Sequence, residues 1–251
     1  MKLEDITDLE TLEELLIYSD LLTEQQTQAL IQSFNRFSSI PVKRVLDIGC
    51  GFGRHSREMN KQGFQVIGID ISEEAIKIAK TKQEDIIYFV ADLRTFESDE
   101  PFDLAYAHNS TMACFLDNAD FILALSNINS LLKPGGLFIF DYFYPTNLVN
   151  QGRYKPDLYL TKKVDGLTLE KRSEHKLDMQ DQIHYEKSEY VVSDGKNRRT
   201  FHKVETLKYY EPEQIKNILK QNGFSEIHLF DRDTYSHITD DTVGIYVITK
   251  K

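Results

Sequence analysis

The sequence predicts an α/β protein with a doubly wound, mostly parallel sheet, and three observations lead to this prediction. Short apolar segments with strand character alternate with helical segments over residues 43–143, which is typical of crossover units on the two faces of a parallel sheet. The first of these strands ends in a glycine-rich turn, of the kind that opens a helix toward a ligand. The length of 251 residues exceeds one average domain but falls short of two, which favours one domain interrupted by an insert.

The elements of this sheet follow in order from the N-terminus. The first forty residues carry leucines at helical spacing and predict two helices, the second from about Thr23 to Phe37. Five apolar strands are then expected, at residues 43–49, 65–70, 85–92, 102–108 and 137–143. Ser72 is the expected N-cap of a helix over residues 72–82. A second crossover helix over residues 117–132 is expected to stop at the segment Lys-Pro-Gly-Gly.

The alternation of strands and helices stops near residue 150. Residues 150–210 contain extended runs separated by turn signals such as Asp-Gly, and they predict three or four antiparallel strands. A helix with proline in its first turn and two more strands complete the chain, at residues 211–224, 226–230 and 243–249. The predicted fold is therefore a Rossmann-like sheet of seven strands, with residues 1–149 and 211–251 as its core. Residues 150–210 form a β-rich insert after the fifth strand.

Composition and charge disfavour several classes of protein. The net charge of −10 argues against nucleic-acid binding through phosphates, although residues 150–210 hold 13 Lys/Arg against 10 Asp/Glu. Two cysteines are too few for a disulfide framework and suit a reducing compartment. There is no run of 18 apolar residues and no secretory signal at the start of the sequence, so we expect a cytoplasmic protein that does not enter a membrane.

The most informative segment is VLDIGCGFGRHS, at residues 45–56. Gly49, Gly51 and Gly53 allow close approach of the backbone to a ligand, and the turn lies between a predicted strand and a predicted helix, so its N–H groups converge on one ligand. Asp70, 17 residues beyond Gly53, ends the second strand, where its carboxylate can accept hydrogen bonds from a ribose diol. Together these residues predict a nucleotide-binding site rather than a tight turn without a ligand.

Two departures from the dinucleotide-binding pattern favour a different nucleotide. The glycines run G-x-G-x-G instead of G-x-G-x-x-G. Asp47, at the end of the first strand, places a carboxylate where a diphosphate would lie and would repel it. The same carboxylate attracts an ammonium or sulfonium group, so the sequence favours a nucleoside with a cationic tail over NAD.

With these motifs the sequence resembles the class I S-adenosylmethionine-dependent methyltransferases, whose seven-stranded sheet has an antiparallel last strand. VLDIGCGFGRHS is similar to their first motif, VIGIDIS to their second, FVADLRTF to the segment that contacts adenine, and LLKPGGLFIFD to the turn into the fifth strand. The motifs occur in the family's order, and with the last helix and strands the resemblance covers about two thirds of the chain. More narrowly, the first two motifs and the β-rich insert are similar to bacterial small-molecule methyltransferases, including sugar-amine N-methyltransferases.

The resemblance implies that S-adenosyl-L-methionine is the cofactor and implies which residues bind it. The amino group of the methionine portion would bind Asp47 and lie near the backbone carbonyl of His108. The methionine and ribose portion would lie along the glycine loop, at Gly49, Cys50, Gly51 and Gly53. The ribose hydroxyls would bind Asp70, and adenine would contact Ile71, Asp92 and Leu93.

The side of the site that would face the methyl acceptor has two candidate catalytic residues. Methyl transfer from a sulfonium needs an aligned lone pair on the acceptor and no metal ion, and a hydroxyl acceptor also needs a general base. His108 follows the fourth strand and is the first candidate for this base; the competing interpretation is a loop histidine that offers only its backbone. Tyr142 ends the fifth strand beside Asp141, and each of the two can face the acceptor or pack in the core.

Other polar residues have stronger structural interpretations. His55 is expected to be a packed residue of the first helix after the glycine loop. Only one of His184 and Tyr185 can face the site if the insert forms a sheet, because alternate residues of a strand face opposite sides. The segment Tyr18-Ser19-Asp20 is the nearest match to the Tyr-Asp pair with which the N-terminal helix of related methyltransferases closes over the cofactor.

The sequence thus predicts an enzyme that transfers a methyl group from S-adenosylmethionine to nitrogen or oxygen of a small-molecule acceptor, as a monomer or homodimer. One alternative is an RNA or protein methyltransferase that docks through the mildly basic insert. Another is a non-catalytic module that binds S-adenosylmethionine and regulates a partner. An NAD-dependent reductase is disfavoured by Asp47.

Overall fold

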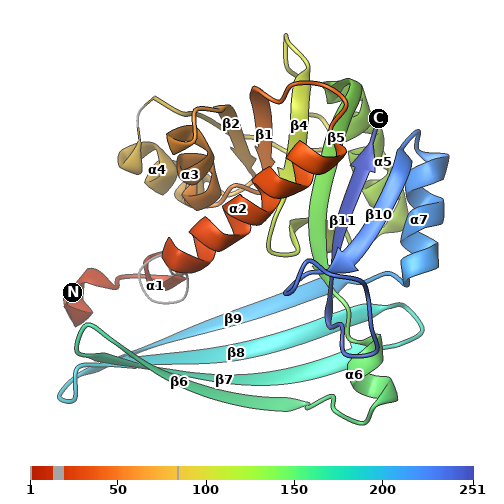
Figure 1. The fold of residues 1–251 in the computed structure, drawn as a ribbon. Helices are drawn as coiled ribbons and strands as arrows, with labels where there is room; N and C mark the ends of the chain where they lie inside the picture. Colours follow the sequence, from red (N-terminus) through yellow and green to blue (C-terminus); the bar gives the residue numbers. More distant parts are fainter. Residues whose placement is uncertain (1, 14–19, 84) are drawn as a thin grey trace.

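The computed structural model describes residues 2–13, 20–83 and 85–251, and a seven-stranded sheet lies at its centre (Figure 1). In spatial order its strands are β10 (Ser225–Asp231), β11 (Gly244–Lys250), β5 (Leu132–Phe143), β4 (Phe102–Ala107), β1 (Arg44–Ile48), β2 (Gln65–Asp70) and β3 (Ile87–Val90). The first five strands of the chain pair in parallel, and β11 runs antiparallel to both of its neighbours. The chain reverses its direction of travel across the sheet between β1 and β4, which confirms the predicted doubly wound fold with an antiparallel last strand.

Helices pack on both faces of this sheet. On one face, α2 (Asp20–Phe37), α3 (Arg54–Lys61) and α4 (Glu73–Lys82) form a buried apolar cluster with alternate residues of the strands. On the other face, α5 (Asn118–Leu131) and α7 (Pro212–Gln221) form a second cluster with the remaining strand residues. The strands read as apolar runs in the sequence because they are buried on both sides. Within the described residues, no helix is long and apolar enough to cross a membrane.

The fifth strand begins earlier than the sequence indicated. β5 starts at Leu132 rather than at residue 137, and its pairing with β4 shifts register between the pairs Phe102–Leu132 and Leu104–Leu137. Gly135 lies in this irregular stretch with a φ of +80°, a conformation that glycine adopts at little cost. The segment Lys-Pro-Gly-Gly therefore ends the helix as expected but is absorbed into the strand as a bulge. Short helical segments complete the core: η1 (Leu3–Asp5), α1 (Leu9–Leu12), η3 (Thr111–Cys114) and α6 (Thr146–Asn150).

The insert forms a separate four-stranded sheet that lies beside the core, below it in Figure 1. Its strands β6 (Asp157–Val164), β7 (Leu167–Asp178), β8 (Ile183–Ser193) and β9 (Arg198–Lys208) pair antiparallel in chain order. Asp165 and Gly166 both have positive φ in the first hairpin, which is the geometry that the Asp-Gly signal predicts. Apolar side chains of the N-terminal segment pack on one end of this sheet, so the insert also contacts the start of the chain. The division into core and insert domains stays a prediction.

Candidate functional site

Two adjoining cavities lie at the carboxyl ends of the parallel strands. Their volumes are about 580 and 330 Å³, and Gly49, Asp70, Asn109 and Thr111 line both of them. Open α/β sheets bind ligands at this edge, where the order of the strands reverses. The shared lining makes the two cavities parts of one site of the size that small-molecule ligands occupy.

The glycine-rich loop between β1 and α3 forms part of the wall of this site. Gly49, Gly51 and Gly53 have φ values of +65°, +51° and +73°, which residues with side chains rarely adopt. A Cβ atom on Gly49 would collide with the Thr111 side chain, and one on Gly53 would collide with Tyr88. Apart from its two chain neighbours, no described residue has an atom within 4 Å of the corresponding position on Gly51. Glycine is therefore required by close packing at the first and third positions, whereas the second leaves open space on the smaller cavity.

Asp70 ties this loop to the end of β2. One of its carboxylate oxygens accepts a hydrogen bond from the Gly51 amide at 2.9 Å, and the other accepts one from the Ser72 amide at 2.9 Å. Each carboxylate oxygen has more than one acceptor site, so Asp70 can shape the loop and still accept hydrogen bonds from a ligand. Ile71, the next residue, lines the larger cavity and is 75% exposed, which places an apolar surface there.

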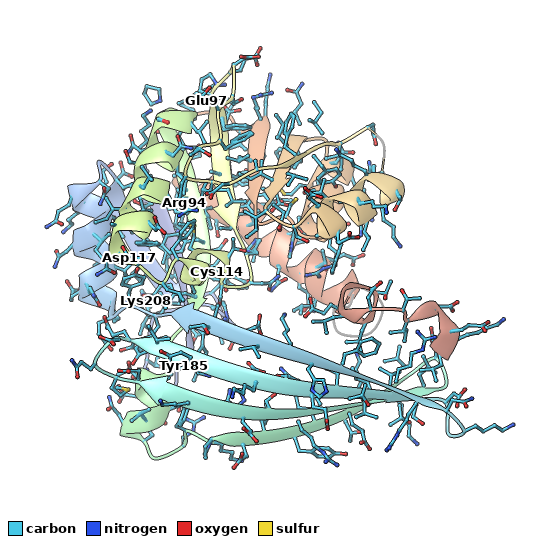
Figure 2. The ribbon with its side chains drawn as sticks, turned by 180° about the vertical axis from the view of Figure 1, so that it is seen from behind. Arg94, Glu97, Cys114, Asp117, Tyr185 and Lys208 are labelled. Carbon is cyan, nitrogen blue, oxygen red and sulfur yellow. The ribbon has the colours of Figure 1, made fainter. Side chains whose placement is uncertain are left out.

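The larger cavity is lined by the predicted residue Asp92 and by its partner Arg94, which sequence reasoning missed. Asp92 is bound by the guanidinium of Arg94 at 2.5 Å, and hydrogen bonds from Arg94 lower the pKa of Asp92. Leu93 lines the cavity beside this pair. Arg94, Cys114 and Asp117 lie on the same side of the core in Figure 2, and all three line the larger cavity. The pair was foreseeable, because the two side chains are only two positions apart in the sequence.

Asp47 and Cys50 line the smaller cavity. Asp47 is 3% exposed, and its carboxylate accepts a hydrogen bond from the Ser56 hydroxyl at 2.5 Å. Burial raises the pKa of Asp47 to about 6, against the opposing effect of this hydrogen bond. No ion pair of Asp47 is found in the described ranges of the chain. Burial, followed by the charges of Asp47 and Asp70, raises the pKa of the Cys50 thiol, which argues against a thiolate nucleophile.

His108 lies at the end of β4 and lines the smaller cavity. Its backbone carbonyl accepts hydrogen bonds from the hydroxyl and the amide of Thr111, at 2.8 and 3.4 Å. The contact of this carbonyl with a methionine amine, which the resemblance implied, stays a prediction. The imidazole is buried, and its Nε2 atom has no hydrogen-bond partner in the described part of the protein.

Tyr142 occupies a different place from the one expected of a catalytic residue. It is 1% exposed, lies in the apolar cluster on the α5 and α7 face, and lines neither of the two cavities. Because successive strand residues face opposite sides, its neighbour Asp141 lies on the other face, where its Oδ1 atom is 3.7 Å from Nδ1 of His108. Asp141 also lines neither cavity, and it adjoins the site through His108.

The insert and the N-terminal segment form the wall of the smaller cavity away from the core strands. Lys203 and Glu205 of β9 line it together with Glu13. The Lys203 ammonium lies 2.5 Å from the carboxylate of Glu13 and 3.0 Å from that of Glu205. Sequence reasoning did not single out these three residues, because it could not fix which face of β9 turns toward the core.

Of the other residues considered from the sequence, His55 lines the site and His184 packs between the insert and the core. His55 is buried, as expected, yet it also lines the smaller cavity, and its Nε2 atom is 2.9 Å from Oε1 of Gln26. His184 packs against Phe143 of the core strand β5, so it is the member of the His184–Tyr185 pair that faces the core. The proposed lid segment Tyr18-Ser19-Asp20 lies outside the residues whose side chains the structure describes.

The chain is similar to several known proteins. A family described as a methyltransferase domain matches residues 45–136. A putative methyltransferase of Geobacillus sp. (strain WCH70) is 25% identical over 217 residues, which cover 83% of this chain and 85% of that protein.

Solved structures show the same fold over nearly the whole chain. An S-adenosylmethionine-dependent methyltransferase from Clostridium acetobutylicum has a TM-score of 0.80 and 18% sequence identity, over 95% of each chain. CalS10 of Micromonospora echinaspora, an amino pentose methyltransferase solved with S-adenosylmethionine bound, has a TM-score of 0.75 and 18% identity, over 91% of this chain and 92% of that one. Both structural matches include the insert, because each covers more of this chain than the core alone contains.

Proposed function

We propose that the chain is a class I S-adenosylmethionine-dependent methyltransferase that methylates nitrogen or oxygen of a small-molecule acceptor. S-adenosylmethionine is the cofactor; when bound, it supplies an electrophilic methyl group on a positively charged sulfur. The acceptor must therefore present a lone pair to the methyl group in a water-poor site.

One observation carries the proposed orientation of the cofactor. Asp47 is a buried carboxylate on the smaller cavity with a raised pKa and no cationic partner among the described residues. A buried charge is stabilised only by an opposite charge or by hydrogen bonds. The ammonium group of the methionine portion supplies both, so we place this portion in the smaller cavity.

The other cofactor contacts follow from this placement. Asp70 lines both cavities and has free acceptor sites for ribose hydroxyls. The larger cavity receives adenine, with Ile71 and Leu93 as apolar surfaces and Asp92 as an acceptor. Gly51 leaves room for the backbone to lie against the ligand.

We place the acceptor between His108 on the core side and Glu205 on the insert side of the smaller cavity. His108 is the group that would accept a proton from the acceptor, since it is a buried imidazole with one unpartnered ring nitrogen. The structural likeness to CalS10, an amino pentose methyltransferase, supports a polar small molecule as the acceptor.

Calorimetry with S-adenosylmethionine and its demethylated product tests the cofactor site, with Asp47→Asn as the variant. We expect binding of both by the wild-type protein and weaker binding by the variant; no binding of either ligand would overturn the proposal. Label transfer from methyl-labelled cofactor is then measured with amines, amino sugars and alcohols, and in parallel with RNA and protein substrates. Label that appears only in RNA or protein would replace the small-molecule acceptor by one of the alternatives.

A further inference from the structure

One face of the core sheet gathers several ionisable side chains at its carboxyl end. Paired residues of neighbouring strands share a face, and the register pairs Asp47 with Tyr106 and Asp141 with Tyr246. His108 is two residues beyond Tyr106 and therefore lies on the same face. This is the face covered by α2 and α3, and it is where the smaller cavity lies.

Asp141 connects two other side chains of this region. It is 2% exposed at the end of β5, and its two oxygens meet different partners. Oδ1 is 3.7 Å from Nδ1 of His108, and Oδ2 is 3.5 Å from a guanidinium nitrogen of Arg232. The carboxylate thus lies between an arginine and the one histidine that the proposed function places beside the acceptor.

Arg232 reaches Asp141 because a glycine makes room for it. The Arg232 amide donates a hydrogen bond to the carbonyl of Gly244 at 2.8 Å, and a Cβ atom on Gly244 would lie 2.5 Å from Nε and 2.6 Å from Cζ of the guanidinium. The Arg232 side chain is 28% exposed and also approaches Asp233 at 3.4 Å. Gly244 therefore allows the guanidinium to lie across the start of β11 and to compensate the buried charge of Asp141.

The ring of His108 is surrounded by side chains from its own strand, β4, and from β1, α3, β5 and β11. The titratable groups that face it are Asp47 of β1, His55 of α3, Tyr106 of β4, Asp141 of β5 and Tyr246 of β11. His55 lies 4.8 Å from His108, ring centre to ring centre, and burial, followed by the charges of His108 and Arg54, lowers the pKa of His55. A neutral His55 leaves no second imidazolium beside His108.

We propose that Asp141, held by Arg232, positions His108 with its proton on Nδ1, so that Nε2 keeps the lone pair with which it accepts a proton from the acceptor. This inference rests on the proposed function of His108. The N–H or O–H bond of the acceptor breaks, its electron pair stays on the acceptor atom, and the proton forms a new bond to Nε2. The resulting imidazolium keeps its Nδ1 proton directed at the Asp141 carboxylate, which stabilises the new positive charge. The separation of 3.7 Å is longer than a hydrogen bond, and such contacts commonly shorten when ligands bind.

The decisive experiment is a double-mutant comparison in kinetics. Asp141→Asn offers an amide N–H to Nδ1, which favours the proton on Nε2 and blocks it as an acceptor. We expect kcat to fall by about 100-fold or more, with the cofactor Kd unchanged within about twofold. If Asp141 acts through His108, the double variant Asp141→Asn, His108→Asn loses no more activity than His108→Asn alone. Additive losses would overturn the proposal, as would unchanged kcat in Asp141→Asn.

Two further variants separate positioning from general stabilisation of the fold. Arg232→Ala should lower kcat less than Asp141→Asn does, and Arg232→Lys should restore part of the loss because it keeps the charge. Asp103→Asn is the matched control: Asp103 is a 3% exposed carboxylate at the opposite end of the same sheet, bound by Lys133 at 2.7 Å and by two backbone amides. It should lower stability without changing kcat or the pH profile of kcat/KM, whereas Asp141→Asn should alter that profile.

A measurement without an acceptor keeps this inference separate from the proposed function. Nitrogen NMR of the His108 ring, in the cofactor-bound wild-type protein, should show the proton on Nδ1, and in Asp141→Asn it should show the proton on Nε2. A wild-type ring protonated on Nε2 when neutral would overturn the positioning role even if methyl transfer occurs. Failure to methylate any acceptor, together with the expected ring state, would instead overturn the proposed function alone.

Discussion

Two carboxylates that are largely shielded from water, one in each sheet, have pKa values shifted in opposite directions. Burial raises the pKa of Asp47 in β1 to about 6, because the hydrogen bond from Ser56 offsets only part of the effect. Burial also acts to raise the pKa of Glu186 in β8, yet its pKa is lowered to about 2, because Lys171 binds it at 2.6 Å and serine hydroxyls add hydrogen bonds. The side chain of Glu186 is 13% exposed, so it is also well shielded from water.

The two carboxylates differ in whether a cationic side chain binds them. The insert pairs its shielded carboxylate, Glu186, with a cation of its own, Lys171, as a scaffold requires. The core holds a carboxylate whose cation is absent from the described residues, and a cavity lies next to it. Perturbed groups of this kind collect at functional sites, because a ligand completes them. We therefore expect the core carboxylate to serve the ligand and the insert carboxylate to serve the fold.

The largest effect is expected from glycine substitutions. Gly49→Ala places a Cβ atom against Thr111 at a position with positive φ, so we expect cofactor affinity to fall by at least ~100-fold, an effect of about 3 kcal/mol. The matched substitution in the insert, Gly166→Ala, also has positive φ but no atom within 4 Å, and it should cost about 1–3 kcal/mol of stability with unchanged affinity. Calorimetry and urea unfolding measure the two quantities, and equal loss of affinity in both variants would remove the distinction between the regions.

Neutralising the two carboxylates should have opposite consequences. Asp47→Asn should weaken cofactor binding by about 10- to 100-fold, the value of a charge-assisted hydrogen bond, while stability stays the same or rises because a buried charge is removed. Glu186→Gln should leave affinity unchanged and lower the free energy of unfolding by about 2 kcal/mol, because Lys171 loses its partner. A fall in stability for Asp47→Asn as large as that for Glu186→Gln would contradict the comparison.

His184, beside Glu186 on the core-facing side of the insert, predicts a pH dependence of stability. Burial, followed by the charge of His175, lowers the pKa of His184 from 6.5 to about 4. Between these values the unfolded chain binds a proton that the folded protein does not, so stability should fall as the pH drops from about 6.5 to about 4, on the order of 2 kcal/mol. Urea unfolding across this range should show a smaller slope in His184→Gln than in the wild type, and an unchanged slope in His202→Gln, because His202 is exposed on the opposite face. Identical slopes in the wild type and His184→Gln would assign the effect to other groups.

The smallest effect concerns the pH dependence of cofactor binding. The raised pKa of Asp47, about 6, means that the carboxylate is protonated in the ligand-free protein below this pH, and a neutral acid binds an ammonium group poorly. Affinity should therefore be constant above about pH 7 and fall by up to ~tenfold per pH unit below about pH 6. Calorimetry between pH 5 and 8 measures this, and Asp47→Asn should lose the dependence. Affinity that stays flat to pH 5 in the wild type would place the ammonium group elsewhere.

Local patterns made part of the site predictable. Gly49, Gly51 and Asp70 were identified because the motif, the strand end and the distance along the chain depend on consecutive residues. The Asp-Gly turn of the insert was predictable for the same reason, since both of its residues adopt positive φ within one hairpin. In contrast, the start of β5 was misplaced, because the bulge at Gly135 depends on pairing with β4.

The sequence alone determined the fold class and the position of the glycine loop and led to the hypothesis of a cationic ligand at Asp47, because each depends on short-range order and on the chemistry of single side chains. Tertiary structure decided that Asp141 and not Tyr142 lies beside His108, and that Lys203 and Glu205 complete the cavity. A strand buried on both faces gives no alternation of apolar and polar residues from which its orientation can be read. Only the pairing of β5 with β11 and the placement of β9 against the core determine which face each side chain occupies.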